Sequence, residues 1–278
     1  MAPTAKRTAK DTVFRDLFKD MGNLLALYKV LHPEDTQVTE EMLGNVTIEN
    51  VLTDQMYNDL GFTVGGRLMI LVEAQSTWSV NIIVRAFMYM AQSYQDRFEA
   101  EEVNLYSSVK INLPEPELYV IYTGDRKDKP NELKFSEEFF GGRKTAIEAT
   151  VKMLYGDDDS NIVGQYVRFC KVLDSQVKEY GYTEKAVQET IRICKDRNVL
   201  KSYLEKREKE VTGIMMALFN DENIQKAYGK EKFVEGENLL ATLMRLLFAA
   251  KRYEDAEKAT TDLVRRNELY REFGLVRA

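Results

Sequence analysis

Apolar residues in the amino-terminal part of the chain follow first a helical and then a strand-like spacing. Over residues 8–31 they recur every three or four positions, which predicts an amphipathic helix. This helix should end before His32-Pro33, because the residue before a proline is forced out of the helical region. His32, the only histidine, is then interpreted as a helix-end residue and not as a base or a ligand. The β-branched run 46–52 predicts an edge strand.

Two short strands joined by a glycine turn are predicted between Tyr57 and Gln75. A two-residue turn at Gly65-Gly66 would pair Val64 with Arg67, whereas a three-residue loop would pair Val64 with Leu68. Side chains alternate with a period of two, so a slip of one residue would move a whole face of the strand. The three-residue loop is preferred because it collects one clean apolar face, formed by Leu60, Phe62, Val64, Leu68, Ile70 and Val72.

The same register gathers the polar side chains of the hairpin on the opposite face. Asp59 should lie directly across from Glu73, with Gln75 two residues further along the second strand. Carboxylates on adjacent strands can hold a divalent ion through oxygen, which suits Mg²⁺ or Mn²⁺. Such an ion lowers the pKa of a bound water and neutralises charge on a phosphate. Gln75 could orient that water, although an amide cannot act as a general acid or base.

An almost entirely apolar helix is predicted next, over residues 78–97, capped by Ser76-Thr77. One charged residue, Arg85, stands within its most apolar stretch. Two interpretations of Arg85 stay open. Its guanidinium could reach the surface along an apolar stem, or it could be held near the carboxylates, where it would bind a phosphate or orient an acid.

The rest of the chain divides by pattern into strands and then helices. The run LYVIY at 118–122 predicts a buried strand, and 146–154 is a strand candidate whose apolar spacing also fits a helix. From residue 162 onward the pattern is helical throughout, with helices predicted over 162–180, 183–197, 200–219 and 234–273. The apolar run 239–250 is too short to span a membrane and is interpreted as a packing or oligomerisation face.

The amino-acid composition argues against a membrane span and against a zinc site. The 278 residues are 44% hydrophobic and 30% charged, and no apolar run approaches the roughly 20 residues of a membrane span. With no signal peptide at the amino terminus, we expect a cytoplasmic protein that does not contact a membrane. Two cysteines, Cys170 and Cys194, and one histidine nearly exclude a zinc site. The net charge of −6 leaves room for a local basic cleft, because affinity depends on the phosphates neutralised at the contact.

Several segments together resemble the Rpn/YhgA-like family of recombination-promoting nucleases, whose members are often described as PD-(D/E)XK nuclease family transposases. These segments are KDTVFRDLF at 10–18, NDLGFTVGGRL at 58–68, ExQST at 73–77, the helix with Asn81 and Arg85, and LPEPELYVIYTG at 113–124. The resemblance covers residues 8–155 well and 231–278 more loosely. Two positions depart from it: Ala74 stands where the family commonly has histidine, and Val80 where relatives often carry proline.

The resemblance implies a PD-(D/E)XK restriction-endonuclease-like α/β (α+β) core, with a mixed central sheet flanked by helices and an all-helical carboxyl-terminal region. It implies metal ligation by Asp59 and Glu73, with Gln75 in the third motif position, which usually holds lysine. Asp11 and Arg85 match further family positions as possible support. We therefore expect a nuclease-like domain over 1–155, a helical region over 156–230 and an oligomerisation segment over 231–278, with a homodimer favoured.

The activity expected on this basis is metal-dependent endonucleolytic cleavage of DNA with low sequence specificity, connected with recombination or mobile elements. The alternative is a nuclease-fold protein without catalysis that serves as a DNA-binding or oligomeric interaction module. The net negative charge, Gln75 in place of lysine and the helical second half favour this alternative.

Overall fold

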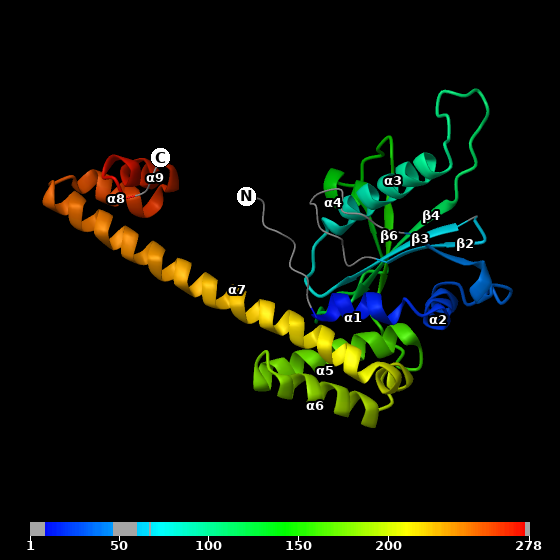
Figure 1. Ribbon diagram of the computed structural model, residues 1–278. Helices are drawn as coiled ribbons and strands as arrows, with labels where there is room; N and C mark the ends of the chain where they lie inside the picture. The colour runs from blue at the N-terminus through cyan, green and yellow to red at the C-terminus, as the bar shows by residue number, and fades with distance from the viewer. Residues whose placement is uncertain (1–8, 47–59, 67, 276–278) are drawn as a thin grey trace. The chain divides into compact units, whose positions relative to one another are not determined.

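The computed structural model describes residues 9–46, 60–66 and 68–275, and the chain divides into two compact units, 1–219 and 220–278. The first unit is an α/β structure with a mixed sheet (Figure 1). Within the described ranges the sheet has six strands in the order β1-β2-β3-β4-β6-β5. They are β1 (Leu43–Val46), β2 (Leu60–Val64), β3 (Leu68–Gln75), β4 (Glu115–Tyr122), β5 (Glu132–Lys134) and β6 (Thr150–Leu154). The central strands β3, β4 and β6 are parallel, and the outer strands are antiparallel.

The predicted register of the hairpin is confirmed. Strand β2 pairs antiparallel with β3, with Val64 opposite Leu68 and Leu60 opposite Val72. Gly65 and Gly66 have positive φ angles of 57° and 68°, a conformation that glycine adopts without steric cost. An edge strand, β1, covers Leu43–Val46 and shares only Val46 with the predicted run 46–52, the rest of which lies outside the described residues.

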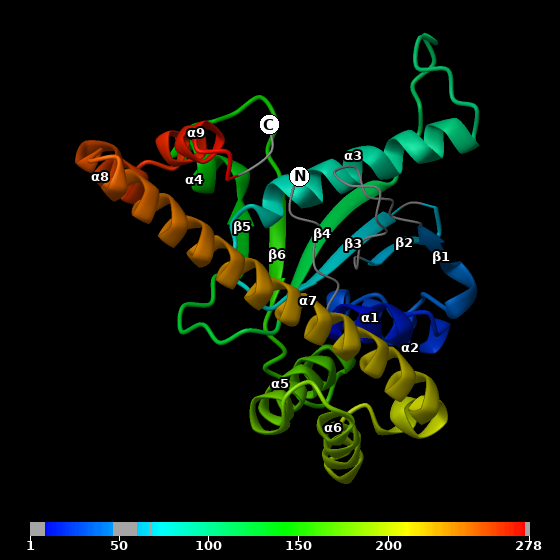
Figure 2. The same cartoon turned by 60° about the vertical axis from the view of Figure 1, so that its left-hand side comes forward.

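Each face of the sheet is covered by helices (Figures 1 and 2). Helices α1 (Ala9–Leu17), α2 (Met21–Leu31) and α5 (Ile162–Tyr180) share one apolar core with Val72 and Tyr119. Helix α3 (Ile82–Ala100) packs on the other face, where Val120 and Tyr122 belong to a second core. Alternate residues of β4 therefore belong to different cores, as expected for a strand buried on both faces.

Two predicted helices differ from the structure for local hydrogen-bonding reasons. The helix predicted over 8–31 is divided into α1 and α2, because the Asp20 side chain accepts a hydrogen bond from the backbone N–H of Asn23 and so caps a new helix. The helix predicted from residue 78 begins at Ile82. The carbonyl of Thr77 instead accepts a hydrogen bond from the side chain of Gln75.

The helical half of the first unit follows the prediction closely. Helix α5 ends at Gly181, and α6 (Glu184–Asp196) matches the predicted 183–197. Helix α7 (Lys201–Ala249) is longer than predicted and has a non-helical residue at Arg207. Residues 156–219 do not form a region separate from the sheet, because α5, α6 and the start of α7 belong to the core that contains α1 and α2. The strand candidate 146–154 contains strand β6, and the described residues also form two short helices, η1 (Glu40–Met42) and α4 (Phe135–Phe140).

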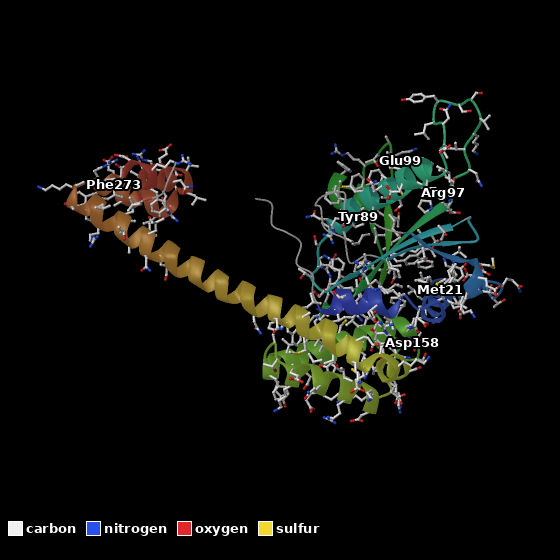
Figure 3. All side chains as sticks on the ribbon, viewed as in Figure 1. Met21, Tyr89, Arg97, Glu99, Asp158 and Phe273 are labelled. Carbon is white, nitrogen blue, oxygen red and sulfur yellow. The ribbon has the colours of Figure 1, made fainter. Side chains whose placement is uncertain are left out.

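The second unit contains the end of α7 with α8 (Tyr253–Thr261) and α9 (Leu263–Glu272). Leu243 and Leu247 are fully buried against these helices, so the apolar run 239–250 is a packing face within this unit. Asp262 separates α8 from α9 by accepting hydrogen bonds at the start of α9. Phe273, labelled in Figure 3, packs on the same core. No helix in the described part of the chain is long and apolar enough to cross a membrane.

Candidate functional site

Gln75 is the last residue of β3 and pairs in register with Tyr122 at the carboxyl end of β4. Its side chain is buried, and both ends of its amide form hydrogen bonds. Oε1 accepts a bond of 2.9 Å from Nη2 of Arg85, and Nε2 donates to the carbonyl oxygen of Thr77. In open α/β sheets, ligands bind outside the carboxyl ends of parallel strands. Gln75 therefore lies at the edge of the sheet where a site is expected.

Arg85 is the fourth residue of α3, and its partly buried guanidinium is directed to Gln75. The structure tests neither of the two interpretations left open by the sequence, because the side chains of the predicted carboxylates lie outside the described residues; it shows that α3 holds this arginine at the end of β3. Tyr89, one turn further along α3, is buried, and Figure 3 shows its position on this helix. The first turn of α3 thus brings a permanent positive charge to the carboxyl end of the sheet.

The backbone at this edge is closely packed. The N–H of Thr123 donates a hydrogen bond of 2.8 Å to the carbonyl oxygen of Gln75, which continues the parallel ladder past β4. A Cβ at Gly124 would overlap the carbonyl oxygen of Ser76 and the ring of Tyr122. Only glycine fits here, and its absence of a side chain lets the end of β4 approach the turn that leads into α3.

Aromatic rings form the neighbouring surface. The ring centroids of Trp78 and Tyr122 are 5.5 Å apart, and those of Tyr122 and Tyr155 are 6.0 Å apart, both in edge-to-face geometry. The guanidinium of Arg126 lies 3.7 Å from the centroid of the Trp78 ring, and the ammonium of Lys129 lies 5.4 Å from that of Tyr155. These basic residues follow β4, so the aromatic and basic side chains come from the carboxyl ends of all three parallel strands.

The structure brings Gln75 and Arg85 together, but it does not describe the predicted carboxylates. Asp59 lies outside the described residues, as do the side chains of Glu73 and Asp11. In the backbone register Glu73 pairs with Val120, and α1, which contains Asp11, covers the face of the sheet opposite α3. Among the residues that are described, no group of three or more His, Cys, Asp or Glu residues is arranged to hold a metal.

A second polar group, which the sequence pattern did not reveal, lies near the start of β4. Nε2 of His32 is 2.9 Å from Oε2 of Glu117, and the Tyr119 hydroxyl donates to the same oxygen. The ammonium of Lys152 is 3.5 Å from this carboxylate and donates to Tyr119 Oη at 3.1 Å. His32 is also the C-cap of α2, as predicted for a helix-end residue. The group thus joins the end of α2 to β4 and β6.

These contacts change the pKa values of Glu117 and Tyr119. Burial alone would raise the pKa of Glu117, but the Tyr119 hydroxyl and the charges of His32 and Lys152 outweigh it, and the pKa is lowered. Burial and the hydrogen bond to Glu117 raise the pKa of Tyr119. The available signal in the sequence was Glu117 itself, an acid two residues before Tyr119 and therefore on the same face of β4.

The fold and the pairing of Gln75 with Arg85 define an α/β protein with a candidate site at the carboxyl end of its parallel strands. Comparisons with protein-family models, with curated proteins and with solved structures find no match to this chain.

Proposed function

We propose that the protein is a metal-dependent deoxyribonuclease that hydrolyses phosphodiester bonds of DNA with low sequence specificity. The observation that supports it most is the hydrogen bond between Gln75 and Arg85 at the carboxyl end of the sheet. The β2–β3 register adds to this support, because extending the ladder by one pair beyond Leu60 and Val72 would set Asp59 opposite Glu73. The resemblance to Rpn/YhgA-like nucleases supplies the reaction.

The available donors fit a hard divalent ion. Asp59 and Glu73 offer carboxylate oxygens, which Mg²⁺ and Mn²⁺ prefer. The Gln75 oxygen already accepts a hydrogen bond from a guanidinium, so a second cation would be repelled there. In this proposal the two carboxylates are therefore the protein ligands. When bound, the ion would lower the pKa of a water and neutralise charge on the scissile phosphate.

Arg85 and Gln75 have separate roles in the proposal. The guanidinium of Arg85 offers forked donors that match the oxygens of a phosphate, and it supplies the positive charge that lysine would bring to position 75. Gln75 positions Arg85, since its own amide is oriented by the bond to the carbonyl of Thr77. The second N–H of the Gln75 amide can donate to an attacking water.

One observation favours the second candidate, a nuclease-fold protein that binds DNA or a partner without cleaving it. Both ends of the Gln75 amide are engaged by protein groups, as in a residue with a purely structural role. This candidate predicts that DNA retention is unaffected when divalent ions are removed. It also predicts that DNA stays intact with either metal.

Incubation with supercoiled plasmid in Mg²⁺, in Mn²⁺ and in EDTA separates the two candidates. The nuclease should nick the plasmid with metal and not with EDTA. Asp59→Ala and Glu73→Ala should each reduce cleavage by more than about a hundredfold, as loss of a metal ligand would. Asp196→Ala, at the exposed end of α6, is the matched acidic control and should cleave normally. Plasmid left intact by the folded wild-type protein would favour the second candidate, and cleavage that survives the double variant would indicate a contaminating nuclease.

We also propose a homodimer, formed through the second unit. Four large apolar side chains are exposed there: Phe248, Tyr253, Leu263 and Val264. Exposed apolar side chains of this kind are typical of association surfaces. Light scattering on the full chain should give twice the monomer mass, and Leu263→Ser with Val264→Ser should return the mass to that of a monomer. A monomeric wild-type protein would contradict this proposal.

A further inference from the structure

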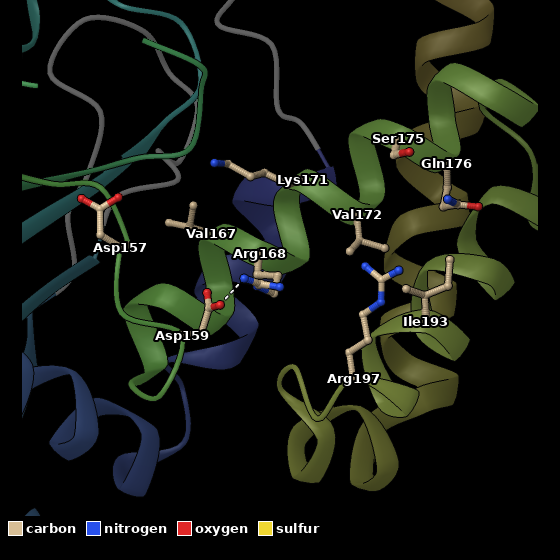
Figure 4. Close-up of a pocket in the computed structure, with 11 residues that line it drawn as sticks. Asp157, Asp159, Val167, Arg168, Lys171, Val172, Ser175, Gln176, Ile193 and Arg197 are labelled. Atoms are coloured by element: carbon tan, nitrogen blue, oxygen red, sulfur yellow. Dashed lines mark hydrogen bonds and ion pairs between the residues drawn. The ribbon is translucent and has the colours of Figure 1, made fainter. Parts of the chain in front are cut away.

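A pocket of about 440 Å³ opens between α5, the end of α6 and the loop that follows β6 (Figure 4). Its volume falls in the range of about 300–1,000 Å³ that is usual for small-molecule sites. Arg168, Val172 and Gln176 line it from successive turns of α5, and Ile193 and Arg197 line it from α6 and its end. Neither Gln75 nor Arg85 lines this pocket, so it is distinct from the candidate nuclease site.

Gln176 has an unusual environment. Its side chain is only 8% exposed and lines the pocket, yet its amide forms no hydrogen bond with any other residue that the structure describes. Its amide atoms are not among the fully buried polar atoms that have no partner, so they are open to solvent on the pocket side. The amide of Gln176 is therefore available to hydrogen-bond a group that enters the pocket.

The pocket has an excess of positive charge. Of its two acids, Asp159 forms an ion pair with Arg168, and Asp157 forms one with Lys129. Arg197 also lines the pocket and forms no ion pair within the described ranges. The positive charge of Arg197 is therefore available to an anion.

Arg197 is an exposed residue at the end of α6. In Figure 4 its guanidinium lies between Val172 of α5 and Ile193 of α6. A guanidinium offers a fork of donors that matches a phosphate, and the amide N–H of Gln176 and the hydroxyl of Ser175 add further donors. Val172 and Ile193 supply apolar walls on which a ring can pack.

We propose that this pocket binds a phosphate-bearing small molecule of about the size of a mononucleotide. Arg197 and Gln176 bind the phosphate, and the apolar walls contact the rest of the ligand. A phosphate fits better than a carboxylate, because it presents more oxygens to the several donors gathered here. The inference does not depend on the proposed nuclease activity, so Asp59→Ala should bind the ligand as the wild type does.

Thermal unfolding and titration calorimetry with adenosine monophosphate test the proposal on the full chain, with adenosine as the uncharged comparison. The nucleotide should raise the Tm of the wild type and of Arg192→Ala, a matched arginine variant on the outer side of α6. Arg197→Ala should weaken binding by about tenfold or more, since it removes charge-assisted hydrogen bonds. Gln176→Met should leave the Tm without ligand unchanged or higher, because an unpartnered amide is replaced by an apolar group, and should weaken nucleotide binding.

Three results would overturn the proposal. One is a wild-type Tm that adenosine monophosphate does not change at millimolar concentration. Another is equal binding by the wild type and Arg197→Ala, which would reduce Arg197 to a residue that stabilises the end of α6. The third is binding of adenosine, or of a DNA oligonucleotide, that is as tight as the binding of adenosine monophosphate. The Tm of the ligand-free variants identifies any that fail to fold, and Gln176→Met then provides the second test.

Discussion

The two ends of the β3–β4 pair carry polar groups that are built in opposite ways. At the start of β4 the acceptor is a charged carboxylate, Glu117, which is surrounded by His32, Tyr119 and Lys152. At the end of β3 the acceptor is the neutral amide of Gln75, and the group it holds is the cation Arg85. A mostly buried carboxylate requires such partners, because an unpaired buried charge is strongly unfavourable. A neutral amide carries no charge of its own and accepts a single hydrogen bond from the guanidinium.

This difference indicates separate purposes. The Glu117 group satisfies its own charges and joins a helix end to two strands, which is what a stabilising network does. The pairing of Gln75 with Arg85 keeps a guanidinium oriented at the edge where ligands bind to parallel sheets. We therefore expect substitutions of the Glu117 group to affect stability, and substitutions of Gln75 or Arg85 to affect stability less and the proposed activity more.

The largest expected effect tests whether the carboxyl end depends on its close backbone packing. Gly124→Ala should destabilise the first unit by on the order of 3 kcal/mol and abolish the proposed cleavage of DNA, because its Cβ would push the end of β4 away from Ser76. Gly213→Ala is the matched control: nothing lies within 4 Å of its Cβ, and alanine in a helix should stabilise by up to about 1 kcal/mol. Denaturant unfolding measures both. A Gly124→Ala protein as stable as the wild type would contradict the packing described here.

Glu117→Gln tests the stabilising role of the other end. We expect a loss of about 2 kcal/mol at neutral pH, because hydrogen bonds to a charged acceptor are replaced by weaker ones. The pKa of Glu117 is lowered in the folded state, so at acidic pH, between the folded and unfolded pKa values, the unfolded chain binds more protons than the folded protein. Its stabilising contribution is present above the unfolded pKa of about 4.3 and is lost as pH falls through the lower folded value. The gap between wild type and variant should therefore close on acidification, and a constant gap would argue against the charged network.

Exchanging the amide and the cation of the Gln75–Arg85 pair tests how much their hydrogen bond contributes to stability. Gln75→Lys should destabilise by about 1–2 kcal/mol, because it removes an acceptor and sets a second cation beside Arg85. Adding Arg85→Gln should recover part of this loss, since the pair again contains one cation and one amide. A double-mutant cycle by denaturant unfolding measures the coupling energy. Strictly additive effects would show that the hydrogen bond between these side chains contributes nothing.

The smallest effect concerns the aromatic surface beside Gln75. Arg126→Ala should cost only about 0.5–1 kcal/mol, because the cation–π contact with Trp78 is partly exposed. Trp78 is the only tryptophan, so its fluorescence reports on this edge alone. The variant should shift the emission of Trp78 to longer wavelength as the ring becomes more hydrated. Lys129→Ala, whose ring contact is with Tyr155, should leave the emission unchanged.

The sequence alone determined the features that depend on local periodicity. Alternation of apolar residues selected the three-residue loop and the pairing of Val64 with Leu68, because any other register would expose an apolar face. Proline at position 33 and glycine at 181 marked helix ends correctly, since their backbone preferences act at the residue itself.

Only the tertiary structure decided which distant residues meet. The pairing of Gln75 with Arg85 depends on how α3 leaves the sheet, and the meeting of His32 with Glu117 depends on α2 packing over β4. The pocket around Gln176 and Arg197 exists because the end of α6 returns to α5. Contacts between residues 10 to 85 positions apart arise from packing of whole elements, which hydrophobic pattern does not encode residue by residue. That is why polar groups in the core were the least predictable part of this protein.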